Sequence, residues 1–233
     1  MEALTKEDFL NGQVLLIDKP LGWSSFQAVN KLKWAIRKRF GLKKIKIGHA
    51  GTLDPLATGL LIICTGKFTK KIPDYQGQTK EYTGTITLGS TTPSFDLETE
   101  INESFPTAHI TEDLITRTTS QFIGEIEQAP PVFSAIKKDG KRLYEYAREG
   151  KEVTVKKRKV LVNSFEITDV RLPEVDFLIS CSKGTYIRSI AHDFGKALDS
   201  GGHLSKLRRT KIGDFNVNIA QDPEVFSERI LQK

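Results

Sequence analysis

The sequence predicts a fold of the α+β class, and two observations lead to it. Short apolar runs typical of β-strands and stretches with the three-to-four-residue spacing of amphipathic helices both occur along the 233 residues. They do not alternate in the regular strand–helix–strand order of a parallel α/β sheet. A hydrophobic fraction of 38% in a chain of this length suffices to bury a substantial core, and no internal repeat occurs. We therefore expect residues 1–233 to form a single domain.

The N-terminal part predicts a strand, a turn and a helix. Residues 14–17 are a short apolar run, and the turn after them leads to Ser24 or Ser25 as a helix N-cap. Apolar positions then recur every three or four residues and give one buried stripe, namely Phe26, Val29, Leu32, Ile36 and Phe40. Gly41 follows the last of them and is expected to end the helix.

Residues 48–61, with the sequence GHAGTLDPLATGLL, combine three glycines with His49 and one carboxylate, Asp54. Asp54-Pro55 is a good helix start, because aspartate caps exposed N–H groups and proline suits the first helical position. Residues 60–64 read as a buried strand. Asp54 is therefore expected on a short, stiff turn beside the core, where a reactive group is best held. Taken alone, Asp54 is more simply a helix cap, and His49 a hydrogen-bonded loop residue.

The middle of the chain predicts further elements in sequence order. A broken helix is expected over residues 67–75, limited by Pro73, followed by a half-buried strand over 82–88 in which threonines alternate with other residues. Later elements are a helix over 112–122 capped by Thr111, a strand with a proline entry over 128–137, a turn at Asp139-Gly140, and a short helix over 142–148 closed by Gly150.

The C-terminal third predicts two paired strands, over residues 160–170 and 175–182, and then a helix that Gly201 stops. Arg188 lies in the first turn of this helix, which is the less favourable end for a positive charge. It is either a surface cation or the partner of a specific anion, which would explain its placement. A last strand is expected over 215–219.

The net charge of +6 comes from 35 lysines and arginines against 29 acidic residues, and the basic residues are clustered. Eight of them and no acidic residue lie between Lys31 and Ile47, and a second cluster covers residues 156–159. A third cluster consists of Lys206, Arg208, Arg209 and Lys211. Solvated surface is the simplest explanation for such runs, but three of them near suspected functional segments favour a polyanionic partner.

Several classes of protein are disfavoured by composition. Cys64 and Cys181 each lie in an apolar run; they could pair if their strands meet, but buried thiols are the expectation in a reducing compartment. The four histidines show no metal-ligand spacing, so no protein-bound metal is expected. No apolar run has membrane length, and residues 1–4 show no basic flank leading into an apolar stretch. We therefore expect a cytoplasmic protein without a signal peptide or membrane span.

Residues 48–61 resemble the G-H-x-G-x-L-D-P-x-A-x-G segment of the tRNA pseudouridine synthase B (TruB) family. Residues 19–25, 128–150, 184–188 and 207–210 are similar to further segments of the same family. The resemblance covers roughly residues 14–215. It implies the pseudouridine synthase fold, with a mixed, mostly antiparallel sheet flanked by helices and an RNA-gripping insertion near 128–160. Many relatives continue into a C-terminal RNA-binding (PUA) domain, for which this chain is expected to have no room.

The family resemblance implies an enzyme that converts uridine to pseudouridine at position 55, in the T loop of tRNA. It assigns Asp54 as the nucleophile and Arg188 as the facing cation, with the target base flipped into the pocket. The other residues it assigns to RNA binding are His49, Lys70, Tyr82, Tyr186 and Leu207. The isomerisation adds no atom and changes no oxidation state, so no cofactor is expected. The expected partner is the T-arm stem-loop, bound by a monomer. Whether Asp54 attacks ribose C1′, adds to the base or removes a ribose proton stays open.

Two other functions are compatible with the residues. One is a non-catalytic RNA-binding or RNA-folding protein that uses the same basic faces, although the presence of Asp54 favours catalysis. The other is an isomerase acting on a different uridine of tRNA or rRNA. A DNA-binding regulator is disfavoured, because neither helix-turn-helix nor zinc-finger spacing occurs.

Overall fold

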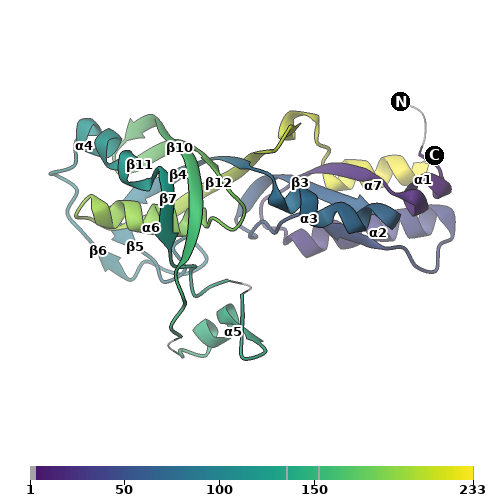
Figure 1. Cartoon of the computed structure of the whole chain (residues 1–233), viewed down its shortest axis with the longest axis horizontal. Helices are drawn as coiled ribbons and strands as arrows, with labels where there is room; N and C mark the ends of the chain where they lie inside the picture. Colours follow the sequence, from purple (N-terminus) through teal and green to yellow (C-terminus); the bar gives the residue numbers. More distant parts are fainter. Residues whose placement is uncertain (1–3, 135, 152, 233) are drawn as a thin grey trace. The chain divides into compact units, whose positions relative to one another are not determined.

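A computed structural model describes residues 4–134, 136–151 and 153–232 (Figure 1). Residues 1–3, which bear on the expectation of no signal peptide, lie outside this set, as does Ala135 within the strand expected over 128–137. The chain forms two compact units: the first contains the residues up to Tyr82 and those from Arg208 onward, and the second contains Thr83–Leu207. The chain passes from one unit to the other inside β4 (Lys80–Leu88) and again inside β12 (Gly202–Ile212). The expectation of a single domain stays a prediction.

The sheet of the first unit is built on β3 (Ala57–Thr65), which is buried along almost its whole length because apolar residues occupy both of its faces. β1 (Val14–Lys19) pairs with it antiparallel, as does the short β2 (Ile47–His49). On its other side β3 neighbours β12, which in turn pairs with β13 (Phe215–Asn216). The strands expected over 14–17 and 60–64 are therefore confirmed, and both are longer than expected.

Besides a short helix after β3, the first unit contains the α-helices α1 (Lys6–Asn11), α2 (Ser25–Phe40) and α7 (Pro223–Gln232). α2 begins as expected, with a capping box between Ser24 and Gln27, and ends at Gly41 in the left-handed conformation (φ 61°). Its buried stripe packs against one face of the sheet and against α7. Phe26 was wrongly placed in that stripe: it is 68% exposed, because Ser25 takes the inward position of the first turn.

Two local expectations in the first unit are wrong. Asp54-Pro55 starts a turn and no helix, because Ala57 donates its N–H to the Asp54 carbonyl (3.1 Å) and β3 begins there. The broken helix after β3 is confirmed as a 3₁₀ helix (Gly66–Lys71) followed by α3 (Ile72–Gly77), but Pro73 lies in the first turn of α3 and does not limit the helix. The strand expected over 215–219 is only β13, followed by a 3₁₀ turn.

The sheet of the second unit has the order β12, β4, β11, β10, β7. β10 (Arg158–Arg171) and β11 (Glu174–Cys181) form the expected antiparallel pair, and β7 (Gly124–Gln128) pairs with the start of β10. α4 (Glu112–Thr118) begins at Thr111 as expected and continues into a 3₁₀ helix (Thr119–Phe122). α6 (Ile187–Ala197) packs its apolar face on the sheet through an aromatic cluster formed by Phe122, Phe165, Phe177 and Phe194.

α5 (Leu143–Arg148) and the hairpin of β8 (Lys137–Lys138) and β9 (Lys141–Arg142) stand apart from the sheet of the second unit (Figure 1). The expected turn at Asp139-Gly140 and the expected short helix are confirmed. The strand expected over 128–137 is wrong, since β7 ends at Gln128. Pro130 and Pro131 follow, and prolines cannot donate to a strand ladder.

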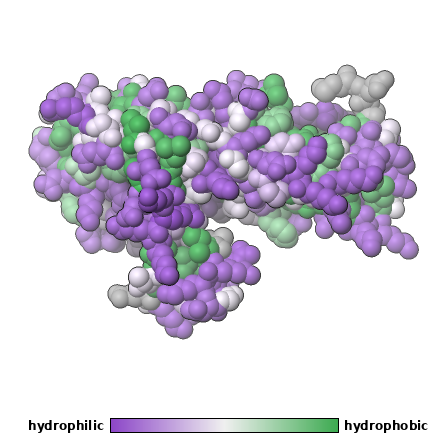
Figure 2. Space-filling model, viewed as in Figure 1, coloured by the Kyte–Doolittle hydropathy of each residue, from purple (hydrophilic) through white to green (hydrophobic). Residues whose placement is uncertain are grey.

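The pairs β1–β3, β2–β3, β7–β10, β10–β11 and β12–β13 are antiparallel, and two isolated bridges are parallel. With helices flanking the sheet, the expected mostly antiparallel α+β architecture is confirmed. Cys64 and Cys181 are both buried thiols, as expected. The visible surface is mostly hydrophilic, with small scattered hydrophobic patches (Figure 2). Among the described residues, no helix is long and apolar enough to cross a membrane.

Candidate active site

The turn that carries Asp54 is attached to the start of α2. Ser25 is buried there, and its Oγ accepts a hydrogen bond from the Leu53 N–H (2.8 Å) and donates one to the Leu53 carbonyl (3.0 Å). Both backbone groups of the residue before Asp54 are therefore bound by one side chain. This contact holds the segment that carries Asp54 at the N-terminus of α2, although Asp54 itself does not begin that helix.

Lys19 fixes the other side of Asp54. Its ammonium is buried and donates to the carbonyls of Pro20 (2.9 Å) and Trp23 (2.6 Å), with Pro55 at 3.5 Å. Burial lowers the pKa of Lys19 to about 8, and the negative charge of Asp54 opposes that shift. Residues 19–25 were expected to form a turn, a helix cap and a family-like segment, but no role was predicted for Lys19 itself.

Arg209 is a third anchor, and it corrects the interpretation of the third basic cluster. The side chain is buried; its Nε donates to the Leu60 carbonyl (2.7 Å) and its Nη2 to the Gly51 carbonyl (3.1 Å). These two carbonyls lie on either side of Asp54 in the sequence. A side chain at Gly59 would clash with the Arg209 backbone, so this glycine lets β12 approach.

The rest of that cluster also has protein partners. Arg208 makes a two-pronged pair with Asp18 (3.0 and 2.6 Å), and Lys211 pairs with Glu81 (3.1 Å). Much of the charge of this cluster is therefore already paired within the protein, and its contribution to binding a polyanion stays a prediction. Composition alone does not distinguish a buried, satisfied arginine from an exposed one.

The remaining predicted site residues of the first unit lie in three elements. His49 ends β2 and is half-buried; burial, followed by the charge of Arg209, lowers the pKa of its imidazole, so the ring is neutral at pH 7. Tyr82 lies in β4 and is half-buried, whereas Lys70 is exposed on the 3₁₀ helix after β3.

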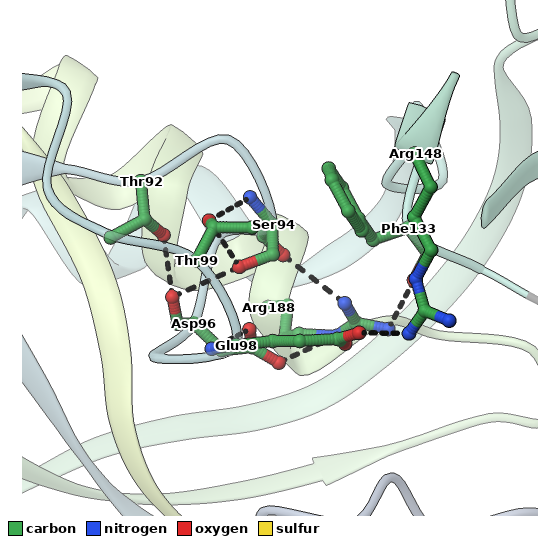
Figure 3. Close-up of polar contacts among 8 residues, drawn as sticks. All are labelled: Thr92, Ser94, Asp96, Glu98, Thr99, Phe133, Arg148 and Arg188. Carbon is green, nitrogen blue, oxygen red and sulfur yellow. Dashed lines mark hydrogen bonds and ion pairs between the residues drawn. The ribbon is translucent and has the colours of Figure 1, made fainter. Parts of the chain in front are cut away.

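Arg188 is 4% exposed, so the surface-cation alternative is wrong. Its guanidinium donates to the carbonyls of Ser94 (3.1 Å) and Phe133 (3.0 Å), and its Nε lies 3.5 Å from a carboxylate oxygen of Asp96 (Figure 3). The sequence predicted a specific anionic partner for Arg188, and the buried carboxylate of Asp96 is one such partner. No local signal in the polar segment after β4 marked this aspartate as special.

Hydrogen bonds within residues 92–99 hold the loop that carries Asp96 in place (Figure 3). The hydroxyls of Thr92 and Ser94 donate to the Asp96 carbonyl (2.6 and 3.0 Å), and the Glu98 N–H donates to the Asp96 carboxylate (2.9 Å). Glu98 in turn pairs with Arg148 at the end of α5 (3.1 Å). The insertion is therefore joined to the surroundings of Arg188 through Arg148 and through the Phe133 carbonyl.

Tyr186 is the N-cap residue of α6. Its N–H donates to the side-chain oxygen of Gln128 (2.7 Å), and the Gln128 amide donates back to the Tyr186 carbonyl (3.0 Å). The Arg158 guanidinium lies 4.8 Å from the centre of the Tyr186 ring. Leu207 lies half-buried in β12. Within the described residues, no group of three or more His, Cys, Asp or Glu side chains has the arrangement of a metal site.

Comparisons with known proteins agree with the sequence resemblance. Residues 37–187 match the model of the TruB family pseudouridylate synthase N-terminal domain, and residues 188–228 match that of the tRNA pseudouridylate synthase B C-terminal domain. The chain is 65% identical to the tRNA pseudouridine synthase B of Flavobacterium johnsoniae, over 97% of this chain and 100% of that protein. It is 52% identical to the enzyme of the same name from Phocaeicola vulgatus, over 97% and 96%.

Solved structures with the same fold include a Cbf5-Nop10-Gar1 complex, with a TM-score of 0.67 and 30% identity over 91% of this chain. Another is the archaeal box H/ACA sRNP Nop10-Cbf5 complex, with a TM-score of 0.66 and 26% identity over 95% of this chain. The chain spans about half the length of those two chains, 52% and 54%. The expected pseudouridine synthase fold is confirmed by the family and by these structures.

Proposed function

The chain belongs to the TruB family of pseudouridylate synthases, and we propose that it converts uridine to pseudouridine at position 55 in the T loop of tRNA, with Asp54 as the nucleophile. The observation that carries the proposal is the construction around Asp54. Ser25, Lys19 and Arg209, all buried, bind backbone groups on both sides of this residue. Relatives of 65% and 52% identity named tRNA pseudouridine synthase B support the choice of tRNA.

The chemistry requires an ionised carboxylate. Pseudouridine forms when the N1–C1′ bond of uridine breaks and C1′ bonds to C5 of the same base, so the product is an isomer. An aspartate can start this reaction by attack at C1′, by addition to the base, or by removal of a ribose proton. In each route Asp54 must be charged, and the buried ammonium of Lys19 favours that form by attraction.

Arg188 is the second charged group of the proposed site. It comes from the other unit, and its pairing with Asp54 is part of the proposal. The carbonyls of Ser94 and Phe133 hold the guanidinium plane, which supports a role that needs fixed geometry. A guanidinium held this way offers a carboxylate two parallel N–H groups and favours the ionised form of that carboxylate by attraction.

The target uridine must leave the loop stack to reach Asp54, at a cost of a few kcal/mol. We assign Tyr82 to stacking on the flipped base and His49, neutral at pH 7, to the space that the base leaves. Tyr186 and the Leu207 main chain are assigned to the base edge, and the exposed Lys70 to a phosphate. The enzyme is proposed to work as a cytoplasmic monomer without a cofactor or metal.

The insertion is proposed to grip the T loop. Its helix presents Tyr144 with the guanidinium groups of Arg142 and Arg148 at 5.9 and 5.4 Å from the ring, and Tyr146 with Lys141 at 4.9 Å. Aromatic rings that stack on unpaired bases and cations that bind phosphates are the usual means of recognising RNA loops.

The test is to map pseudouridine in all RNA of cells that lack this protein, and then to restore either the wild-type gene or the Asp54→Asn variant. We expect loss of pseudouridine confined to the T-loop uridine, and recovery with the wild type alone. Loss at a different tRNA or rRNA position would contradict the proposed substrate. Recovery with Asp54→Asn would contradict the proposed nucleophile and favour a non-catalytic RNA-folding role.

A further inference from the structure

The exposed face of α2 carries a groove that no residue of the proposed active site uses. Trp34 lines this groove and is half exposed (50%). The residues that line the groove with Trp34 include Asn30, Lys33, Arg37, Lys38 and Leu42. A half-exposed indole offers a flat aromatic face on which a partner can stack, and its meaning here comes from the cations that line the same groove.

The charge of this groove is uncompensated. Lys31 pairs with Glu224, but for Lys33, Arg37 and Lys38 no carboxylate lies within ion-pair distance among the residues the structure describes. The Lys38 ammonium lies 4.9 Å from the centre of the Trp34 ring, and the Nε of Arg37 donates to the Leu42 carbonyl (3.2 Å). The groove therefore combines an aromatic platform with three lining cations, of which Lys38 lies close to the ring.

We propose that this Trp34 groove binds an unpaired nucleotide of the substrate RNA, with its base stacked on Trp34 and its phosphate bound by Lys33, Arg37 and Lys38. The inference rests on the proposed function, because the occupant is part of the tRNA. Stacking on an aromatic ring beside cations is how proteins hold single-stranded nucleic acid without reading its sequence. The charge complementarity is strong, since the whole stretch from Lys31 to Ile47 contains eight basic residues and no acidic one.

The position of the groove on α2 limits which nucleotide of the RNA it can bind. Ser25, in the first turn of α2, binds Leu53 beside Asp54. Trp34 lies about 14 Å further along the helix, because an α-helix rises about 1.5 Å per residue. A nucleotide whose base is flipped to Asp54 does not reach that far. The groove therefore takes a nucleotide other than the target, and the proposal assigns it to an unpaired nucleotide outside the T arm, which the comparison of full-length tRNA with the stem-loop tests.

The path between the two places is also suited to RNA. Phe26, Asn30 and Trp34 are spaced by four residues, so they follow one another along one exposed face of the helix. Phe26, at the Asp54 end, is 68% exposed. The amide of Asn30 offers both a donor and an acceptor between the two rings.

The experiment compares two substrates, full-length tRNA and the isolated T-arm stem-loop, and measures the dissociation constant and kcat/KM for each. Trp34→Ala is expected to weaken binding of full-length tRNA at least about fivefold and to leave the stem-loop unchanged. Trp34→Phe keeps an aromatic platform and is expected to stay within about twofold of the wild type. In the wild type, stacking on Trp34 is expected to quench tryptophan fluorescence when full-length tRNA binds. Trp34→Phe retains only Trp23, so the quenching that arises from Trp34 should be absent from this variant.

A matched pair of charge variants separates the groove from general attraction. Lys38 lines the groove, whereas Lys43 is exposed in the same basic stretch but outside it. Each variant, Lys38→Gln or Lys43→Gln, removes one positive charge, so non-specific electrostatics predicts equal losses. The groove predicts a larger loss for Lys38→Gln, on full-length tRNA only.

The inference would be overturned if Trp34→Ala bound full-length tRNA with wild-type affinity, or if it bound full-length tRNA and the stem-loop with equally reduced affinity. It would also be overturned if Trp34 were required for binding to anionic lipid vesicles and had no effect on binding of tRNA. Melting temperatures of the variants exclude misfolding as the cause of a loss. Absence of pseudouridine formation by the wild-type protein on either RNA is a different result, and it would contradict the proposed function itself.

Discussion

Replacement of Arg209 by methionine separates the role seen in the structure from the role suggested by the sequence. Methionine has a similar length and no charge, so it fills much of the same space. The change removes the hydrogen bonds from Arg209 to the carbonyls of Leu60 and Gly51 (2.7 and 3.1 Å) and leaves the buried Leu60 and the half-buried Gly51 without this donor. The turn that carries Asp54 then loses its attachment to β12.

The expected loss of stability is large. A hydrogen bond from a charged donor contributes about 1.5–3 kcal/mol, so two of them amount to roughly 3–5 kcal/mol once partial relaxation is allowed. Unfolding entropy is about 2.1 cal/mol/K per residue, which is roughly 0.5 kcal/mol/K for this chain. We therefore expect the melting temperature of Arg209→Met to fall by about 6–10 °C.

Lys206→Met is the matched control, because Lys206 belongs to the same basic cluster but is 67% exposed, with Glu174 at 3.8 Å. Its free energy of unfolding should change by no more than about 0.5 kcal/mol. Thermal melts and tRNA binding are measured for both variants. An unchanged melting temperature for Arg209→Met, together with weaker tRNA binding, would refute the structural role and restore the interpretation as an RNA-contacting cation.

Two further predictions concern pH. Between about pH 8 and 10.5 Lys19 is neutral in the folded protein and protonated in the unfolded chain, so its titration makes the free energy of unfolding rise with pH. Loss of the proton also weakens the hydrogen bonds from Lys19 to the carbonyls of Pro20 and Trp23, so kcat should fall above pH 8. A flat kcat profile from about pH 7 to 9.5 would contradict this prediction. Burial also lowers the pKa of His192, whose ring stacks on Phe95 (3.9 Å between ring centroids). The contribution of the neutral imidazole to the free energy of unfolding is therefore fully present above pH 6.5 and is lost as the pH falls below this value. His192→Phe keeps the stacking and should reduce the loss of stability between pH 7.5 and 5.5 in denaturant melts.

Elements with complete local signals could be predicted from the sequence. α2 carries its start at Ser24 and its end at Gly41 within its own residues, and β10 and β11 alternate clearly enough to be paired. Asp54-Pro55 shows the limit of local signals: the capping preference is real, but residues from Ala57 onward are drawn into β3, which leaves no room for a helix. Pairing within the sheet outweighs the local preference.

The candidate site was predicted through its motifs, and its supporting contacts were not. Arg188 and Asp96 are far apart in the chain, and the polar segment that carries Asp96 has no periodicity to indicate burial. Arg209 lies among exposed cations in the sequence, and only the backbone of Gly51 and Leu60 explains its burial. Long-range hydrogen bonds of this kind leave no pattern in a single sequence.

The most direct measurement of the central claim is a single-turnover assay of Asp54→Asn on T-arm RNA, with tRNA binding and melting measured on the same preparation. Asparagine keeps the shape of the side chain and removes the nucleophilic carboxylate. We expect pseudouridine formation to vanish while tRNA binding stays within about tenfold, equivalent to roughly 1.4 kcal/mol. Formation of pseudouridine by Asp54→Asn at a rate comparable to that of the wild type would contradict the assignment of Asp54 as the nucleophile.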